Sequence, residues 1–116
     1  RALEDPDADV REKAALGLAF RSDSTVVDPL LAALRDESAQ VREKAAMGLS
    51  FPTSPRVVNA LIKAAADPDS QVREKVILAL GFSGDARATA AIVEATKDPD
   101  PQVREKAVTA LTMLAR

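Results

Sequence analysis

Apolar residues recur along this chain at the spacing of one face of an α-helix. Between residues 8 and 20 they are Val10, Ala14, Gly17 and Leu18, at positions i, i+4, i+7 and i+8. The pattern returns three more times at an interval of 31 residues, and each copy opens with the same tetrapeptide: Val10–Lys13, Val41–Lys44, Val72–Lys75 and Val103–Lys106. We therefore predict a structural repeat of 31 residues.

Each repeat divides into two predicted helices, each behind a residue that can cap its first free N–H groups. One, called helix B, runs from about residue 8 to residue 20 in the first copy, and the four copies follow Asp7, Ser38, Asp69 and Asp100. The other, called helix A, is predicted at Val26 to Arg35, Val57 to Ala66 and Ala88 to Lys97, behind Asp23, Ser54 and Asp85. Because proline lacks an N–H, we expect Pro29 to kink the first helix A or to postpone its start to Asp28.

Small residues occupy one position inside helix B. Gly17 and Gly48 stand there in the first two copies, and Ala79 and Ala110 in the last two. We interpret this position as one where a neighbouring backbone leaves no room for a larger side chain, since glycine costs a helix about 1 kcal/mol relative to alanine.

Two helices of this length cannot bury their own apolar faces, so the pairs are expected to stack around one continuous core. The 23 alanines among the 116 residues suit closely packed helices. The predicted fold class is all-α, an α-solenoid of stacked helix pairs.

The repeat frame places the whole chain, residues 1–116, in one domain. Its units are residues 5–35, 36–66, 67–97 and 98–116, of which the last is partial, and residues 1–4 align with the end of a helix A. Because neither end carries a polar capping repeat, we expect the chain to be a fragment of a longer protein. We also expect its uncapped terminal repeats to permit end-to-end self-association.

Composition argues against most catalytic and metal chemistry. The chain has no Cys and no His, which leaves no zinc site of the usual kind and no activated Ser or Cys nucleophile. The carboxylates of Asp98 and Asp100 are expected in exposed turns, where solvent keeps them ionised. Residues 5–9 begin like a calcium loop, but Val10 and Leu16 stand where that motif needs Gly and Glu. We expect no enzyme activity, no metal and no cofactor.

The charge balance bears on the choice of partner. With 16 Lys plus Arg against 18 Asp plus Glu the net charge is −2, which does not favour nucleic acid. Trp and Tyr, which stack on bases, are absent. No apolar run approaches the roughly 18 to 20 residues of a membrane span, so we expect no membrane contact by this segment.

The run Asp-Pro-Asp-x-x-Val-Arg-x-x-Ala-Ala-x-x-Leu, repeated over essentially the whole chain, resembles the short HEAT repeats, the type also found in phycobilin lyase HEAT-like proteins. This resemblance implies a right-handed superhelix of antiparallel helix pairs. It also implies a ladder of hydrogen bonds and ion pairs between neighbouring repeats, formed by the Asp that opens each repeat and the Arg that follows its Val. The matching residues are Asp5, Asp36, Asp67 and Asp98 with Arg11, Arg42, Arg73 and Arg104.

The resemblance further implies that helix B lines the concave face of the stack, where variable residues meet ligands. Three columns of side chains then run down this face: Lys13, Lys44, Lys75 and Lys106; Leu16, Met47, Leu78 and Thr109; and Phe20, Phe51, Phe82 and Met113. Within one helix their spacing is i, i+3 and i+7, which puts them on adjoining turns. We predict an apolar strip with a basic border that recognises an amphipathic, partly acidic segment of another protein.

Each column also has a purely structural interpretation. The Phe side chains can turn into the core, because Arg21, Pro52 and Ser83 stand one place later, where the family has an aliphatic core residue. The Lys column can be neutralised by its chain neighbours, Glu12, Glu43, Glu74 and Glu105.

Two other functions compete with protein binding. A structural spacer without a ligand, in a larger bacterial protein, is favoured if Leu16, Met47 and Leu78 are covered, whereas their exposure favours binding. A bilin lyase-type subunit is the third hypothesis, and it follows from the resemblance alone.

Overall fold

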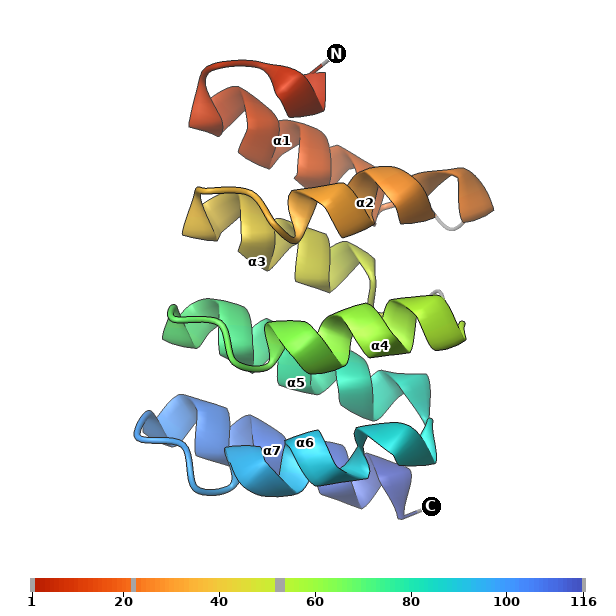
Figure 1. Ribbon diagram of the computed structural model, residues 1–116, viewed down its shortest axis with the longest axis vertical. Helices are drawn as coiled ribbons and strands as arrows, with labels where there is room; N and C mark the ends of the chain where they lie inside the picture. The colour runs from red at the N-terminus through yellow and green to blue at the C-terminus, as the bar shows by residue number, and fades with distance from the viewer. Residues whose placement is uncertain (1, 22, 52–53, 116) are drawn as a thin grey trace.

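The computed structural model describes residues 2–21, 23–51 and 54–115, and within them the chain is helical throughout, without a strand (Figure 1). The α-helices of these residues are α1 (Ala8–Ala19), α2 (Val27–Ala33), α3 (Ala39–Gly48), α4 (Pro55–Ala64), α5 (Ser70–Ser83), α6 (Thr89–Ala95) and α7 (Pro101–Leu114). Short 3-10 turns form at η1 (Ala2–Glu4), η2 (Ser24–Val26) and η3 (Ala86–Ala88), so helices A of the first and third repeats begin as a 3-10 turn.

The helices form two layers, and within each layer they follow one another along the longest axis of the molecule. Figure 1 shows α2, α4 and α6 in front and α1, α3, α5 and α7 behind, with the N-terminus at one end of the stack and the C-terminus at the other. We call the outward surface of the second layer, made of the B helices, the B face. The overall dimensions are 39 × 29 × 19 Å. The stack of helix pairs predicted from the 31-residue repeat is therefore confirmed.

The helix starts follow the predicted caps with one exception. Carboxylates of Asp7, Asp69 and Asp100 accept N–H groups of the first helical turn, as predicted from their positions in the repeat. Ser38 departs from this pattern, because its hydroxyl lies 3.3 Å from Oε1 of Gln40 and accepts no backbone N–H. The prediction that Ser38 caps its helix through the side chain is wrong.

Helices A begin behind the predicted residues Asp23, Ser54 and Asp85, which accept the N–H groups of Thr25, Val57 and Arg87. Pro29 lies in the first turn of α2, which starts at Val27 after the η2 turn. The proline ring is harmless there because the N–H groups of a first turn have no partner within the helix.

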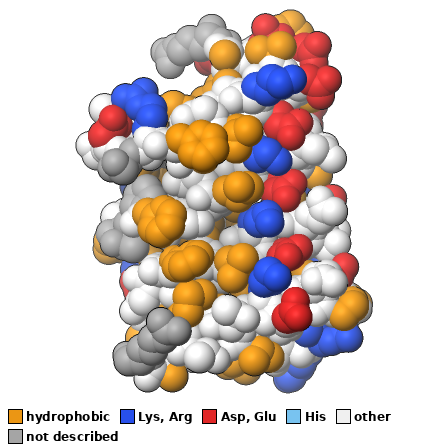
Figure 2. Space-filling view, turned by 180° about the vertical axis from the view of Figure 1, so that it is seen from behind, with side chains coloured by type: hydrophobic (Ala, Val, Ile, Leu, Met, Phe, Trp, Pro, Cys, Tyr) orange, Lys and Arg blue, Asp and Glu red, His pale blue; other side chains and the backbone are white. Residues whose placement is uncertain are grey.

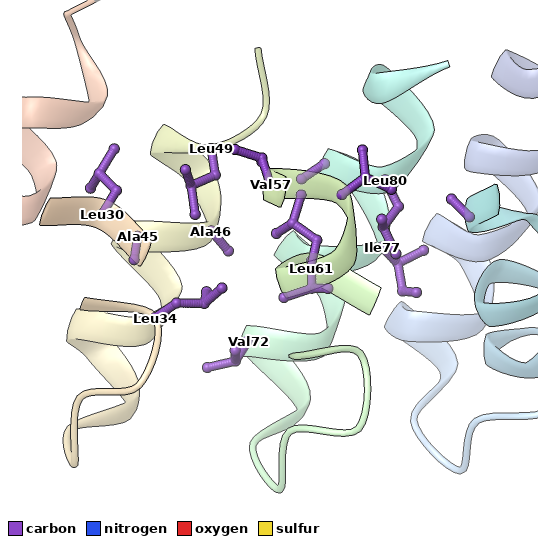
Figure 3. Close-up of a cluster of buried hydrophobic side chains, with 14 of the residues drawn as sticks. Leu30, Leu34, Ala45, Ala46, Leu49, Val57, Leu61, Val72, Ile77 and Leu80 are labelled. Atoms are coloured by element: carbon purple, nitrogen blue, oxygen red, sulfur yellow. The ribbon is translucent and has the colours of Figure 1, made fainter. Parts of the chain in front are cut away.

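The core lies between the two layers and continues from repeat to repeat. Leu30, Leu49, Leu61, Ile77 and Leu80 are buried in it, and Figure 3 shows side chains from both layers meeting along the stack. Val41, Val72 and Val103 are fully buried, as predicted for the first residue of the helical stripe. Val10, the equivalent residue of the first repeat, is 38% exposed, so the prediction that it faces the core is wrong. It lies at the end of the described stack, where no helix B precedes α1.

Neighbouring B helices approach one another through small residues. A Cβ atom on Gly48 would lie 3.1 Å from Cα of Ala19, and one on Gly81 would lie 2.9 Å from Cα of Ala110. The close approach predicted at Gly48 is thus present. At Gly17 it is absent, because a Cβ there would have nothing within 4 Å.

Candidate functional site

Arginine–aspartate pairs join successive repeats on one side of the stack. Nε of Arg11 donates to Asp36 at 2.9 Å and its Nη2 donates to the second carboxylate oxygen at 3.2 Å. Arg42 binds Asp67 in the same way at 2.8 and 3.2 Å. Arg73 binds Asp98 at 2.8 and 3.1 Å. Such two-pronged contacts fix direction as well as distance.

Each arginine also holds the turn of its own repeat. Nη1 of Arg73 donates to the carbonyl oxygens of Asp67 and Pro68, at 2.8 and 3.2 Å. The carboxylate at the next repeat accepts a backbone N–H in addition, since Asp98 accepts from the N–H of Asp100 at 2.9 Å. One guanidinium therefore ties two consecutive inter-helix turns together.

Hydrogen bonding in this ladder shifts the ionisation of its members. Burial acts to raise the pKa of Asp98, but the hydrogen bonds from Arg73 and from the N–H of Asp100 outweigh it, and the pKa is lowered. The pKa of Asp36 is lowered by the same balance of burial against Arg11 and the N–H of Ser38. The pKa of Arg73 is raised, chiefly by its hydrogen bond to Asp98. Both partners are thus held in their charged forms.

The phenylalanines of the B face are exposed. Phe20 is 82% exposed, Phe51 75% and Phe82 50%, so the alternative that they fill the core is wrong. The space between the layers is already occupied by Leu49 and Leu80, which are almost completely buried. The rings of Phe51 and Phe82 lie side by side, with centroids 5.6 Å apart. Met113, in the same column, is half-buried and packs on the core.

A second apolar column lies beside the phenylalanines. Met47 is 37% exposed, and Leu16 and Leu78 are half-buried, so all three present part of their surface to solvent. Thr109 is exposed, and its hydroxyl donates to the carbonyl of Glu105 at 3.2 Å. Figure 2 shows apolar side chains gathered along the B face in a strip beside a row of charged groups. We call the side chains of Leu16, Phe20, Met47, Phe51, Leu78 and Phe82 the apolar stripe.

The border of the apolar stripe carries both signs of charge. Lys44 lies 3.4 Å from the carboxylate of Glu12 in the preceding repeat, and Lys106 lies 3.4 Å from that of Glu74. Figure 2 shows basic and acidic groups alternating along this row. Glutamates of the neighbouring helices therefore neutralise two of the four lysines of the predicted basic border. Lys13 and Lys75 form no ion pair with the described residues.

The other layer holds a groove that the sequence did not predict. It lies between α2 and α4, has a volume of about 1020 Å³, and is lined by Leu31, Ala60, Arg35 and Lys63 among others. At its edge Arg56 of α4 binds the carboxylate of Asp28 of α2. Arg87 donates to Asn59 one repeat later, at 3.4 Å. The alignment of Asp28 with Asn59 and of Arg56 with Arg87 at the 31-residue period was the available signal for these contacts.

Clusters of metal-binding side chains and membrane-spanning helices are both absent from the described residues. Residues 2–21, 23–51 and 54–115 contain no group of three or more acidic side chains placed to hold a metal ion. In the same part of the chain, no helix has the length and apolar character needed to cross a membrane.

The stacked helix pairs and their regular ladder define an α-solenoid repeat protein. The family model of the HEAT repeats matches residues 1–81 and 58–115, and the chain therefore belongs to the HEAT repeat proteins. The crystal structure of an engineered protein, a target of the Northeast Structural Genomics Consortium, is similar with a TM-score of 0.72 and 20% sequence identity over 98% of this chain. This chain spans 60% of that structure, and the likeness concerns the fold alone. The comparison with curated proteins gave no match.

Proposed function

We propose that this chain is a non-enzymatic interaction module whose B face binds an apolar segment of another protein. HEAT repeats are generally scaffolds for protein interactions. The observation that carries the proposal is the exposure of Phe20, Phe51 and Phe82 in one row. A contiguous apolar patch is typical of binding surfaces, because exposing several large apolar side chains together is costly in water.

The packing of the helices supports a position of the B face on the inner, concave side of the stack. The B helices meet through Ala and Gly, whereas α2 and α4 leave a groove between them. A stack whose one layer is more tightly spaced curves toward that layer. This supports the assignment of the B face as the concave surface, against which an elongated partner gains contacts from several repeats.

The dimensions of the apolar stripe fit a helix or an extended peptide. The stripe crosses three B helices, α1, α3 and α5, which at the usual interaxial distance of 8–10 Å span roughly 16 to 20 Å. An α-helix of about 11 to 13 residues has that length. Its apolar face would lie on the stripe, and acidic residues at its edge would meet Lys13 and Lys75. Over so short a stretch we expect a contact area below the roughly 800 Å² per partner of stable complexes, and therefore weak binding.

Peptide selection on the intact chain tests this proposal. Peptides are selected from a random library on the wild type, and their affinities are then measured for two variants. Phe51→Ser changes the apolar stripe, whereas Val93→Ser removes an exposed valine of α6 in the other layer. We expect Phe51→Ser to weaken binding at least about tenfold, because a buried aromatic anchor dominates such contacts. Val93→Ser should leave the affinity unchanged.

Two results would overturn the proposal. Selection that yields no binding peptide at all would support the spacer without a ligand. Equal affinities of the two variants would place the binding site away from the apolar stripe. The bilin lyase hypothesis has its own test, which is retention of pigment when the chain is mixed with a bilin.

A further inference from the structure

The apolar stripe offers little to the polar groups of a peptide backbone. It crosses the sides of helices, whose own N–H and C=O groups are bonded within each helix. Ser50 and Ser83 adjoin Phe51 and Phe82 in the chain, and Thr109 continues the aliphatic column. All three hydroxyls donate to carbonyls of their own helices, at 3.4, 2.6 and 3.2 Å. Their protons are therefore already used and are not free to bind a partner.

This shortage of hydrogen-bond donors bears on the conformation of a bound segment. An extended segment forms no hydrogen bonds within itself. Contact with apolar side chains would then remove water from its N–H and C=O groups without replacing it, which is unfavourable. An α-helix satisfies the same groups internally and presents only side chains to the surface. The stripe therefore favours a helix over an extended segment.

The spacing of the B helices is close to the repeat of an amphipathic helix. Neighbouring helices of this kind lie about 8 to 10 Å apart. Seven residues of an α-helix rise about 10.5 Å. In a helix inclined slightly to the stack axis, side chains one heptad apart therefore reach equivalent places on successive B helices. On α3 that place is Met47 with Phe51, and on α5 it is Leu78 with Phe82.

One lysine within the charged border lacks a partner. Its neighbours in the row, Lys44 and Lys106, each lie 3.4 Å from a glutamate of the preceding repeat. The glutamate equivalent to these for Lys75 is Glu43, but its carboxylate lies 3.8 Å from Lys44 instead. Lys75 therefore forms no ion pair with the described residues. An acidic side chain on a bound segment would complement it.

These observations, which rest on the proposed function, narrow the class of partner. We propose that the segment bound at the apolar stripe is an amphipathic α-helix with an acidic residue beside its apolar face. Apolar residues one heptad apart cover the Phe51 and Phe82 places, and the acidic residue binds Lys75. Basic and acidic groups alternate along the rest of the row (Figure 2), so apolar contacts supply most of the affinity and Lys75 sets the register.

Two peptide libraries of equal length and composition test the conformation. In one, apolar residues stand at i, i+3, i+4 and i+7, as on one face of a helix; in the other they stand at i, i+2, i+4 and i+6, as on one face of an extended segment. Selection on the intact chain should yield binders from the first library alone. The Cα chemical shifts of an isotope-labelled binder should become helical on binding. Proline at its centre, on the side away from the stripe, should weaken binding at least about tenfold.

The variant Lys75→Gln tests the register. It should weaken binding of a selected peptide about threefold, and replacing the acidic residue of the peptide by its amide should then have no further effect. Lys97→Gln, the matched control, removes an exposed lysine that follows α6 in the other layer and should leave the affinity unchanged. Circular dichroism of both variants shows whether the fold is retained.

The possible failures of this proposal and of the proposed function differ. Binders from the alternating library alone, equal yields from the two libraries, or a bound peptide with extended Cα shifts would overturn the helix and leave the proposed function standing. Equal effects of the two lysine variants would overturn the role of Lys75. A lack of binders from both libraries would overturn the proposed function and this proposal together.

Discussion

Arg73 and Arg104 occupy the same position in consecutive repeats but have different partners. Both donate to the carbonyls of their own turn, and among the described residues Arg73 also binds a carboxylate, that of Asp98, whereas Arg104 does not. The side chains of Arg73 and Asp98 are 16% and 10% exposed, so the expectation that the carboxylate of Asp98 lies in an exposed turn is wrong. The two arginines therefore separate the contribution of the inter-repeat ion pair from that of the turn.

Replacing these arginines by alanine should have unequal effects. We expect Arg73→Ala to lower the free energy of unfolding by about 1 to 3 kcal/mol, because it removes two charge-assisted hydrogen bonds from the largely buried carboxylate of Asp98. Arg104→Ala loses only the turn bonds and should cost less than about 1 kcal/mol. Urea unfolding followed by circular dichroism measures both. Equal losses would mean that the ion pair adds nothing to the stability of the stack.

Acid should weaken the ladder. The pKa of Asp98 is lowered in the folded chain, since the hydrogen bonds of Arg73 and of the N–H of Asp100 outweigh burial. A carboxylate with a depressed folded pKa stabilises the fold above its unfolded pKa of about 4, and this stabilisation is lost as the pH falls toward the folded value.

The variant Asp98→Asn isolates this effect. The difference in unfolding free energy between wild type and Asp98→Asn should be largest near neutral pH and should shrink as the pH falls below about 4, where the wild-type carboxylate takes up a proton. Denaturant unfolding at a series of pH values measures the difference. A difference that stays constant with pH would contradict the assignment.

The spacing between helices depends on a few small residues. Gly81 of α5 lies where a Cβ would come 2.8 Å from Cβ and 2.9 Å from Cα of Ala110 on α7. Gly17 of α1 has the same residue type inside a helix B but open space around it. A comparison of Gly81 with Gly17 therefore separates the energetic cost of a steric contact with the neighbouring helix from the low helix propensity of glycine.

Alanine at these two glycines should therefore shift stability in opposite directions. Gly81→Ala is expected to destabilise by about 1 to 3 kcal/mol, because the backbone of α7 must move away. Gly17→Ala should stabilise by up to about 1 kcal/mol, since alanine is the better helix former. Thermal unfolding gives both values. A stabilising Gly81→Ala would show that the α5–α7 contact is not close.

At the level of elements, the sequence predicts the order of helices well because the apolar spacing and the caps both recur every 31 residues. It does not predict where each helix B ends. α1 ends at Ala19 and α3 at Gly48, so Phe20 and Phe51 lie beyond the last helical residue, where a helical wheel no longer applies. In the third repeat α5 continues to Ser83, and Gly84 ends it with a positive φ of 65°. The exposure of the phenylalanines therefore could not be predicted from the sequence and is known only from the structure.

For the whole molecule, the position of a repeat in the stack determines the exposure and the partners of residues that are identical in sequence. Val10 and Val103 open the same motif, yet one is exposed and the other buried, because burial in a solenoid comes from the neighbouring repeat. The ion pairs of Lys44 and Lys106 also depend on the neighbouring repeat, because their partners Glu12 and Glu74 belong to preceding helices. A repeat alignment shows what each position contains but not which neighbour reaches it.

The central claim is that the apolar stripe of the B face, rather than the groove between α2 and α4, is the binding surface. An NMR titration of the isotope-labelled chain with a selected peptide tests it most directly. The account predicts that the signals of Met47, Phe51, Leu78 and Phe82 shift together as peptide is added. Shifts centred on Leu31, Ala60 and Lys63 of the groove, with the stripe unchanged, would contradict it.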